Sequence, residues 1–74
     1  MTLDCRGQLC PQPVIALARA AKEADVGIVI RIQTDDPAAA VDIPAWCRMR
    51  GHQCSIVSDS SGVLVHDVTI MRAR

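Results

Sequence analysis

The stretch TLDCRGQLCPQPVIALARAA, Thr2–Ala21, decides the fold, because it predicts a strand, a loop and a helix in direct succession. Residues 2–5 alternate between polar and apolar side chains, which predicts a short strand with Leu3 and Cys5 on one face. Residues 6–9 contain a glycine and form the loop. A strand that feeds a helix in this way is the first half of a βαβ unit.

Two prolines mark the start of the helix. Proline is favoured in a first helical turn, because the N–H group that it lacks would have no partner there. Pro11 therefore opens the helix, Pro13 still lies in its first turn, and Cys10 is the N-cap or its close neighbour. The helix is expected over residues 11–24, with an apolar stripe at Val14, Leu17, Ala18 and Ala21.

The middle of the chain predicts a second strand and a second helix. Apolar residues alternate in Ile28–Gln33, as in a half-buried strand. Asp36 is a natural N-cap, and Pro37 suits the first helical position. Because Pro44 removes a hydrogen bond inside this helix, we expect a kink or a restart near Asp42. Residues expected to share its buried face are Ile43, Trp46 and Cys47, with Gly51 as a left-handed cap.

Residues 53–58 and 63–70 predict two more strands, and residues 59–62, Asp-Ser-Ser-Gly, are typical of a hairpin turn. The element order is therefore β-α-β-α-β-β. The first two strands should be parallel, with a right-handed crossover, and the last two antiparallel. The expected fold is an α/β (α+β) two-layer sandwich: a mixed four-stranded sheet with both helices on one face. Its length predicts a single domain over residues 1–74.

Composition excludes several classes of function. Eight basic and eight acidic residues give a formal net charge of zero, and Trp46 is the only aromatic residue. Direct nucleic-acid binding needs a basic field and, for single strands, stacking aromatics, so we do not expect it. No segment predicts a membrane span or a signal peptide. We therefore expect a cytoplasmic monomer with reduced cysteines.

Cys10 is the residue with the clearest chemical role. The thiolate is the reactive form of cysteine, and a helix N-terminus lowers the pKa of a thiol placed there. Because Pro11 and Pro13 have no N–H groups, the N–H groups of Gln12 and Val14 are the ones expected to face the sulfur. Arg6, in the preceding loop, could add a positive charge. Cys10 also lies at the carboxyl end of the first strand, where α/β folds often place their sites.

The segment LDCRGQLCPQPV resembles the signature of the TusA-like (SirA-like) sulfur-carrier family, Asp-x-Arg-Gly-x-x-Cys-Pro-x-Pro. The matching residues are Asp4, Arg6, Gly7, Cys10, Pro11 and Pro13. A second block resembles the family's second-helix region, with Asp36-Pro37, Asp42-Ile43-Pro44, Trp46 and Gly51-His52. The position of Cys5 is often a small apolar residue in the family.

The resemblance implies a sulfurtransferase that carries sulfane sulfur as a persulfide on Cys10. The donor would be a cysteine desulfurase or a rhodanese-type protein, and a downstream protein would accept the sulfur. Family members serve tRNA thiolation, molybdenum-cofactor synthesis or sulfur oxidation. No cofactor or metal is implied beyond the transient persulfide. Residues expected to form the active-site loop and helix cap are Asp4, Arg6, Gly7, Pro11, Gln12 and Pro13, with Asp4 and Arg6 held by a salt bridge or backbone contacts.

Other interpretations of these residues are open from the sequence. The same scaffold could be a non-catalytic regulatory module, or a thiol-disulfide protein that uses Cys5 and Cys10. Core packing is the simpler explanation for Cys5, and it also suits Cys47 and Cys54, although these two could ligate zinc together with His52. Asp36 and Trp46 are candidates for partner docking, with core packing the alternative for Trp46. His66 is expected to be a hydrogen-bonded residue at the edge of the core.

Overall fold

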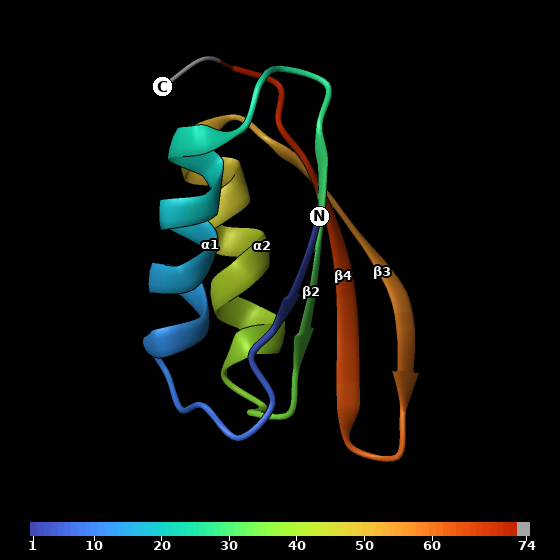
Figure 1. Ribbon diagram of the computed structural model, residues 1–74. Coiled ribbons are helices and arrows are strands. Elements are labelled where there is room, and N and C mark those ends of the chain that lie inside the picture. The colour runs from blue at the N-terminus through green and yellow to red at the C-terminus, as the bar shows by residue number, and fades with distance from the viewer. Residues whose placement is uncertain (73–74) are drawn as a thin grey trace.

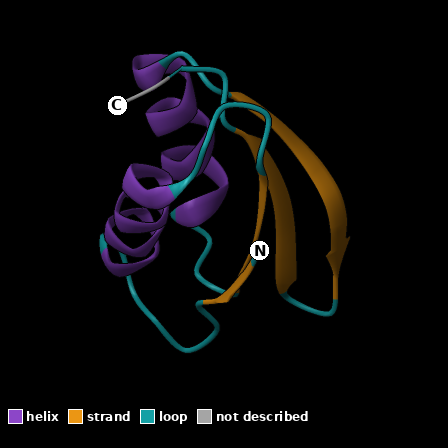
Figure 2. Ribbon diagram, turned by 45° about the horizontal axis from the view of Figure 1, so that its top comes forward, coloured by secondary structure: helices purple, strands orange, loops and turns teal. Residues whose placement is uncertain are grey.

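The chain folds into a four-stranded sheet with two helices on one of its faces (Figures 1 and 2). The computed structural model describes residues 1–72. Its elements, in chain order, are β1 (Thr2–Asp4), α1 (Gln12–Glu23), β2 (Val29–Thr34), α2 (Ala39–Arg50), β3 (Gln53–Ser60) and β4 (Val63–Thr69). Within this part of the chain, neither helix has the length and apolar character needed to cross a membrane. The predicted two-layer α/β sandwich is confirmed.

The sheet is mixed, with the strand order β1-β2-β4-β3. β1 pairs with β2 in parallel, and β4 pairs antiparallel with both β2 and β3. In the ribbon, the β1–α1 loop, the β2–α2 loop and the β3–β4 turn all lie at the same end of the sandwich (Figure 1). The topology thus gathers Cys10 and the acidic β2–α2 loop at one end of the molecule.

Alternation in β2 places its isoleucines against the helices, as the sequence predicts. Ile30 and Ile32 are fully buried, whereas Arg31 between them is exposed and forms a salt bridge with Asp67 on β4. Leu17 of α1 is fully buried on the same core. The other buried apolar residues of this core are Cys5, Ala39, Ile43, Trp46, Cys47, Val68 and Ile70.

Both helices begin slightly later than the sequence predicts. α1 begins at Gln12, and Pro11 occupies its N-cap position. α2 begins at Ala39 rather than at Pro37, and Ala38 is its N-cap. Asp36 instead accepts a hydrogen bond from the Ala38 amide, at 3.1 Å, within the turn before the helix. The predicted cap is wrong because this turn adds two residues before the regular helix.

Pro44 does not make α2 restart, so that part of the prediction is wrong. The helix is continuous from Ala39 to Arg50 with Pro44 inside it. Proline leaves the carbonyl of Ala40 without its helical partner. Ala40 is exposed, so water can satisfy that carbonyl. The predicted cap at Gly51 is confirmed, with φ 78° and ψ 25°, a left-handed conformation in which glycine is least strained.

His66 lies on the core side of β4 without a hydrogen-bond partner. It was expected to be hydrogen-bonded, and that expectation is wrong: the residue is 0% exposed, and neither ring nitrogen has a partner in the described chain. It pairs across the sheet with Ile32 and Ile56. Burial lowers the pKa of His66 below its ordinary value of 6.5, because a charged ring would lose its hydration.

We expect His66→Leu to stabilise the protein by about 1–3 kcal/mol, because it removes a buried polar group that has no partner. The unfolded chain binds a proton at His66 more readily than the native state does. Stability therefore falls as the pH drops through about 6.5, and the variant should lose part of this dependence. Urea unfolding at several pH values measures both effects. His52 is present in both proteins, so its contribution cancels; equal stability at every pH would contradict the prediction.

Candidate functional site

Cys10 is an exposed free thiol immediately before α1. It lies one residue before the N-cap Pro11, to which it is joined by a cis peptide bond. Pro11 and Gln12 are exposed, whereas Pro13 is buried and fixes the first turn of α1 against the core. The sulfur is thus presented at the surface by a helix whose first turn is anchored.

Two carboxylates from the chain after β2, one in the β2–α2 loop and one in α2, contact Cys10. Its amide donates a hydrogen bond to Asp36 Oδ2 at 2.7 Å, and its Sγ donates to Asp42 Oδ2, also at 2.7 Å. The hydrogen bond to Asp42 raises the pKa of the Cys10 thiol, followed by smaller effects of desolvation and of the negative charges of Asp42 and Asp36. The resting sulfur is therefore held in its protonated form.

This result reverses the prediction that the helix N-terminus lowers the pKa of Cys10. The amide of Gln12, expected to face the sulfur, donates to the Leu9 carbonyl at 2.8 Å instead. A helix N-terminus carries about half a positive charge, whereas Asp42 brings a full negative charge into direct contact with the sulfur. The carboxylate stabilises the protonated thiol, and its effect is the larger one.

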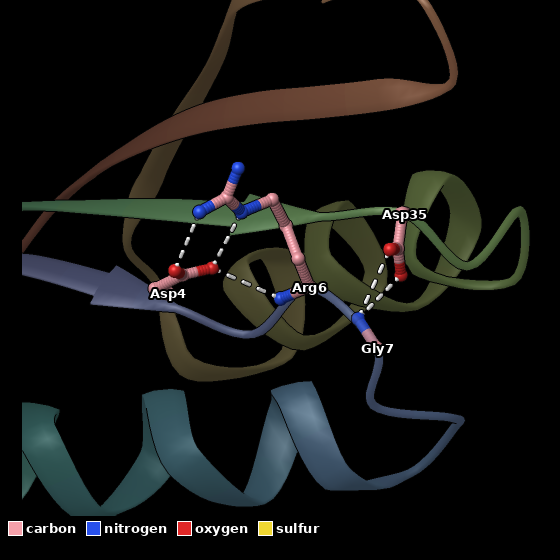
Figure 3. Close-up of polar contacts among 4 residues, drawn as sticks. All are labelled: Asp4, Arg6, Gly7 and Asp35. Atoms are coloured by element: carbon pink, nitrogen blue, oxygen red, sulfur yellow. Dashed lines mark hydrogen bonds and ion pairs between the residues drawn. The ribbon is translucent and has the colours of Figure 1, made fainter.

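The loop before Cys10 is held by two acidic residues (Figure 3). Arg6 donates to both carboxylate oxygens of Asp4, at 2.9 and 2.8 Å, and its backbone amide also donates to Asp4 at 3.2 Å. Arg6 holds the pKa of Asp4 down at about 2. Gly7, at φ 82°, donates its amide to both oxygens of Asp35, at 2.8 and 3.0 Å. Asp35 thereby ties this loop to the end of β2.

Arg6 does not act on the sulfur, contrary to the sequence-based expectation. Its guanidinium lies over Asp4, on the side away from α1 (Figure 3). The charges that act on the Cys10 thiol come from Asp42 and Asp36. The expected salt bridge between Arg6 and Asp4 does form, with a separation of 2.8 Å. Arg6 therefore positions the loop and leaves an acidic environment around the thiol.

Among the described residues, Cys10 itself does not line a cavity large enough for a small substrate. The side chains packed around it, which include Pro13, Val14 and Ala39, leave a space too small for one. A hollow of about 320 Å³ lies beside it and shares Asp36 with it. The other residues lining this hollow are Thr34, Asp35, Pro37, Ala40, Asp59, Gly62 and Leu64. A reactant for Cys10 must therefore arrive across an open, acidic surface.

Two exposed apolar residues are sequence neighbours of Cys10 and of its contact Asp42. Leu9 precedes Cys10 and is 73% exposed; Val41 precedes Asp42 and is 69% exposed. Isolated exposed apolar residues are common on protein surfaces. Beside an exposed thiol, they provide apolar area that a docked partner protein could cover.

The other cysteines lie in or against the core, as the sequence predicts. Cys5 is 2% exposed, and burial raises the pKa of its thiol. Cys5 and Cys10 are both free thiols in the described chain, with no disulfide between them. Cys47 and Cys54 share a hydrogen bond, and burial raises the pKa of Cys47 to about 12. The described chain has no group of three metal-ligating side chains, and Nδ1 of His52 accepts the Met71 amide at 3.1 Å.

Trp46 and Asp36, the two candidates for partner docking, both make contacts within the chain itself. Trp46 is 7% exposed, and its ring lies against that of His52, with the centroids 5.4 Å apart. Core packing is therefore the role that the structure shows for Trp46. Asp36 is half-buried and bonds the amides of Cys10 and Ala38. Its carboxylate connects the two helix starts, and its part in docking stays a prediction.

Sequence reasoning missed the contact roles of Asp35 and Asp42. Asp42 was noted only for the expected kink and as part of the second matching block, and Asp35 was not singled out. The one available signal was topological: parallel strands bring the loops at their carboxyl ends together. That rule places the β1–α1 and β2–α2 loops side by side, but it does not say which carboxylate reaches the sulfur.

Comparison with known proteins gives consistent results. The family model described as "Sulfurtransferase TusA" matches residues 1–70. Two proteins of Archaeoglobus fulgidus named "Putative sulfur carrier protein" are similar to this chain. One is 34% identical over 53 residues, 72% of this chain and 73% of the relative. The other is 43% identical over 51 residues, 69% of this chain and 66% of the relative.

Among solved structures, the crystal structure of a SirA-like protein from Desulfitobacterium hafniense has the same fold. The TM-score is 0.84, over 96% of this chain and 97% of that chain, at 25% sequence identity. The family match spans the exposed thiol and both loops that hold it. The chain belongs to the TusA family of sulfurtransferases, with a SirA-like fold.

Proposed function

We propose that this protein is a sulfur carrier that accepts sulfane sulfur on Cys10 as a persulfide and passes it to an acceptor protein. The observation that carries the proposal is the exposed Cys10 thiol, which lies within the TusA family match and, among the described residues, does not line a cavity large enough for a small substrate. Transfer between two protein thiols needs an exposed sulfur and a docked partner, and it needs no enclosed pocket.

Loading begins when the Cys10 thiol loses its proton and the sulfur attacks the outer sulfur of a donor persulfide. The new S–S bond forms on Cys10, the S–S bond of the donor breaks, and the donor leaves as a thiolate that takes up a proton. Discharge repeats the exchange: an acceptor thiolate attacks the outer sulfur, and Cys10 leaves as a thiolate and is reprotonated. Neither exchange needs an external oxidant or reductant.

The acidic surroundings of Cys10 favour release of the sulfur. The carboxylates of Asp42 and Asp36 raise the pKa of the thiol, and the same charges disfavour an anionic persulfide at this position. A carrier that holds sulfur weakly can hand it on. The same charges favour partners with a basic surface around their own reactive thiol.

The donor, in this proposal, is a cysteine desulfurase or a rhodanese-type protein. tRNA thiolation, molybdenum-cofactor synthesis and sulfur oxidation would all use the same transfer step. A cytoplasmic location, a monomeric state and the absence of direct nucleic-acid binding stay predictions.

A loading and discharge experiment tests the proposal. The protein is incubated with a cysteine desulfurase and L-cysteine, separated from the donor, and its intact mass is measured. We expect the added mass of one sulfur atom, which is lost again when an excess of a small thiol is added. Failure to gain sulfur from a desulfurase, or from a rhodanese supplied with thiosulfate, while the donor itself carries a persulfide, would contradict the proposal.

A further inference from the structure

A second candidate site lies at the end of the sandwich opposite Cys10. The final turns of α1 and α2 and the segment after β4 meet there, whereas the loop that carries Cys10 lies at the other end (Figure 1). Because α1 has 12 residues, it is about 18 Å long. The two ends of the molecule are therefore separate surfaces.

This end contains a cavity of about 340 Å³, which we call the basic cavity. Its cationic and imidazole side chains come from three segments: Lys22 from α1, Arg50 from the end of α2 with His52 just after the helix, and Arg72 from beyond β4. Its apolar part is formed by Ala18, Ala21, Trp46 and Met49. Small-molecule sites commonly combine a cavity of this size with apolar walls and a few polar groups.

The cations are close to one another. The side chain of Arg72 lies across Gly51, where an added Cβ atom would come within 2.9 Å of Arg72 Cδ. Burial lowers the pKa of His52, and the positive charges of Arg50 and Arg72 lower it further. Because Nδ1 of His52 accepts the Met71 amide, the proton of the neutral ring is on Nε2, which is left as a donor.

In the part of the chain that the structure describes, no carboxylate pairs with either of the two guanidinium groups, those of Arg50 and Arg72. Within residues 1–72 the salt bridges join Arg6 to Asp4 and Arg31 to Asp67, and neither Arg50 nor Arg72 has an acidic partner. Like charges that share a site repel each other. An anion bound between them would remove that repulsion, and the planar guanidinium matches the oxygens of phosphate.

We propose that the basic cavity binds a small molecule that carries a phosphate group and a short apolar body. The two guanidinium groups suit a doubly charged phosphate better than a single carboxylate, and the alanine, methionine and tryptophan surface suits the apolar body. A nucleic-acid backbone is disfavoured, because the cations line a recess and the chain has no net charge.

Trp46 supplies a direct probe of binding. It is the only aromatic residue of the chain and it lines the cavity, so its single indole N–H signal in an NMR spectrum reports occupancy. In a titration with phenyl phosphate, we expect a saturable shift of this signal. Inorganic phosphate should bind more weakly, because it lacks the apolar body, and phenol should not bind, because it lacks the charge.

Matched variants separate a built site from general attraction to positive charge. Arg50→Gln and Arg72→Gln should each weaken phenyl phosphate binding by about tenfold or more, since each removes a charged hydrogen-bond donor. Arg19→Gln is the control, because Arg19 is an exposed cation of α1 that does not line the cavity. Arg72 lies outside both helices, so its substitution tests the site without altering α2.

Three results would overturn the inference. They are the absence of saturation by phenyl phosphate, equal binding of phenol, and equal weakening by the Arg19→Gln control. Tighter binding of a short single-stranded RNA through the same residues would assign the cavity to nucleic acid instead and would also overturn it. The Cys10→Ser variant should bind phenyl phosphate as the wild type does, so this test is independent of sulfur transfer.

Discussion

Cys10→Ser is expected to abolish sulfur loading completely, because a serine hydroxyl cannot form the S–S bond of a persulfide. The residue is exposed and the two side chains are similar in size, so the variant should remain folded. The measurement is the intact mass after incubation with a cysteine desulfurase and L-cysteine. No sulfur should be gained at any donor concentration.

Cys54→Ser is the matched control for this loss. Cys54 is half-buried and hydrogen-bonds with Cys47, away from the exposed thiol. We expect it to load sulfur as the wild type does. If Cys10→Ser still gained sulfur, or if Cys54→Ser lost it, another cysteine would be the carrier and the proposed role of Cys10 would be wrong.

The second large effect that we expect is a lower pKa of the Cys10 thiol in the Asp42→Asn variant. The aspartate carboxylate accepts the thiol proton in a 2.7 Å hydrogen bond and is the main cause of the raised pKa. An asparagine has a similar shape without the charge, so it stabilises the protonated thiol less. The thiolate fraction at neutral pH should then rise, and each tenfold rise corresponds to a pKa change of about one unit.

The rate of Cys10 alkylation by iodoacetamide, measured against pH in a Cys5, Cys47 and Cys54 serine background, gives this pKa. The midpoint for Asp42→Asn should move to lower pH. Asp59→Asn is the control, because Asp59 lines the neighbouring hollow without a hydrogen bond to Cys10. A midpoint that stays in place or rises would show that Asp42 does not hold the thiol proton.

Sulfur discharge from the loaded Asp42→Asn variant should be slower than from the loaded wild type, because the variant lacks the carboxylate whose charge disfavours an anionic persulfide. The lower pKa of Cys10 as a leaving thiol acts in the opposite direction. Discharge rates to a small thiol measure the balance, and faster release by the variant would contradict the proposal that the acidic surroundings favour release.

The fold was predictable because its signals are local. The alternation of Ile30 and Ile32 set the buried face of β2, although Ile28, which was expected to share it, lies before the strand and is exposed. The two prolines before Val14 marked the start of α1. Gly62 marked the hairpin turn, where it and Ser61 have positive φ values of 76° and 55°. Each of these signals depends on a few neighbouring residues, so the sequence carries them directly.

The chemistry of the site was only partly predictable, because it depends on contacts between distant segments. Cys10 and Asp42 are 32 residues apart, and Gly7 and Asp35 are 28 apart. The helix rule applied to Cys10 alone predicts a lowered pKa. The carboxylate brought to it by α2 reverses the direction, and no local pattern shows that Asp42 points at the sulfur. The missing partner of His66 was hidden for the same reason.

The most direct test of the central claim is to locate the sulfur on the chain. After loading by a cysteine desulfurase, the protein is alkylated and digested, and the peptide that contains Cys10 is identified by tandem mass spectrometry. We expect one added sulfur on Cys10 and unmodified thiols at Cys5, Cys47 and Cys54. Sulfur on one of these three, or a disulfide between Cys5 and Cys10 in place of a persulfide, would contradict the account.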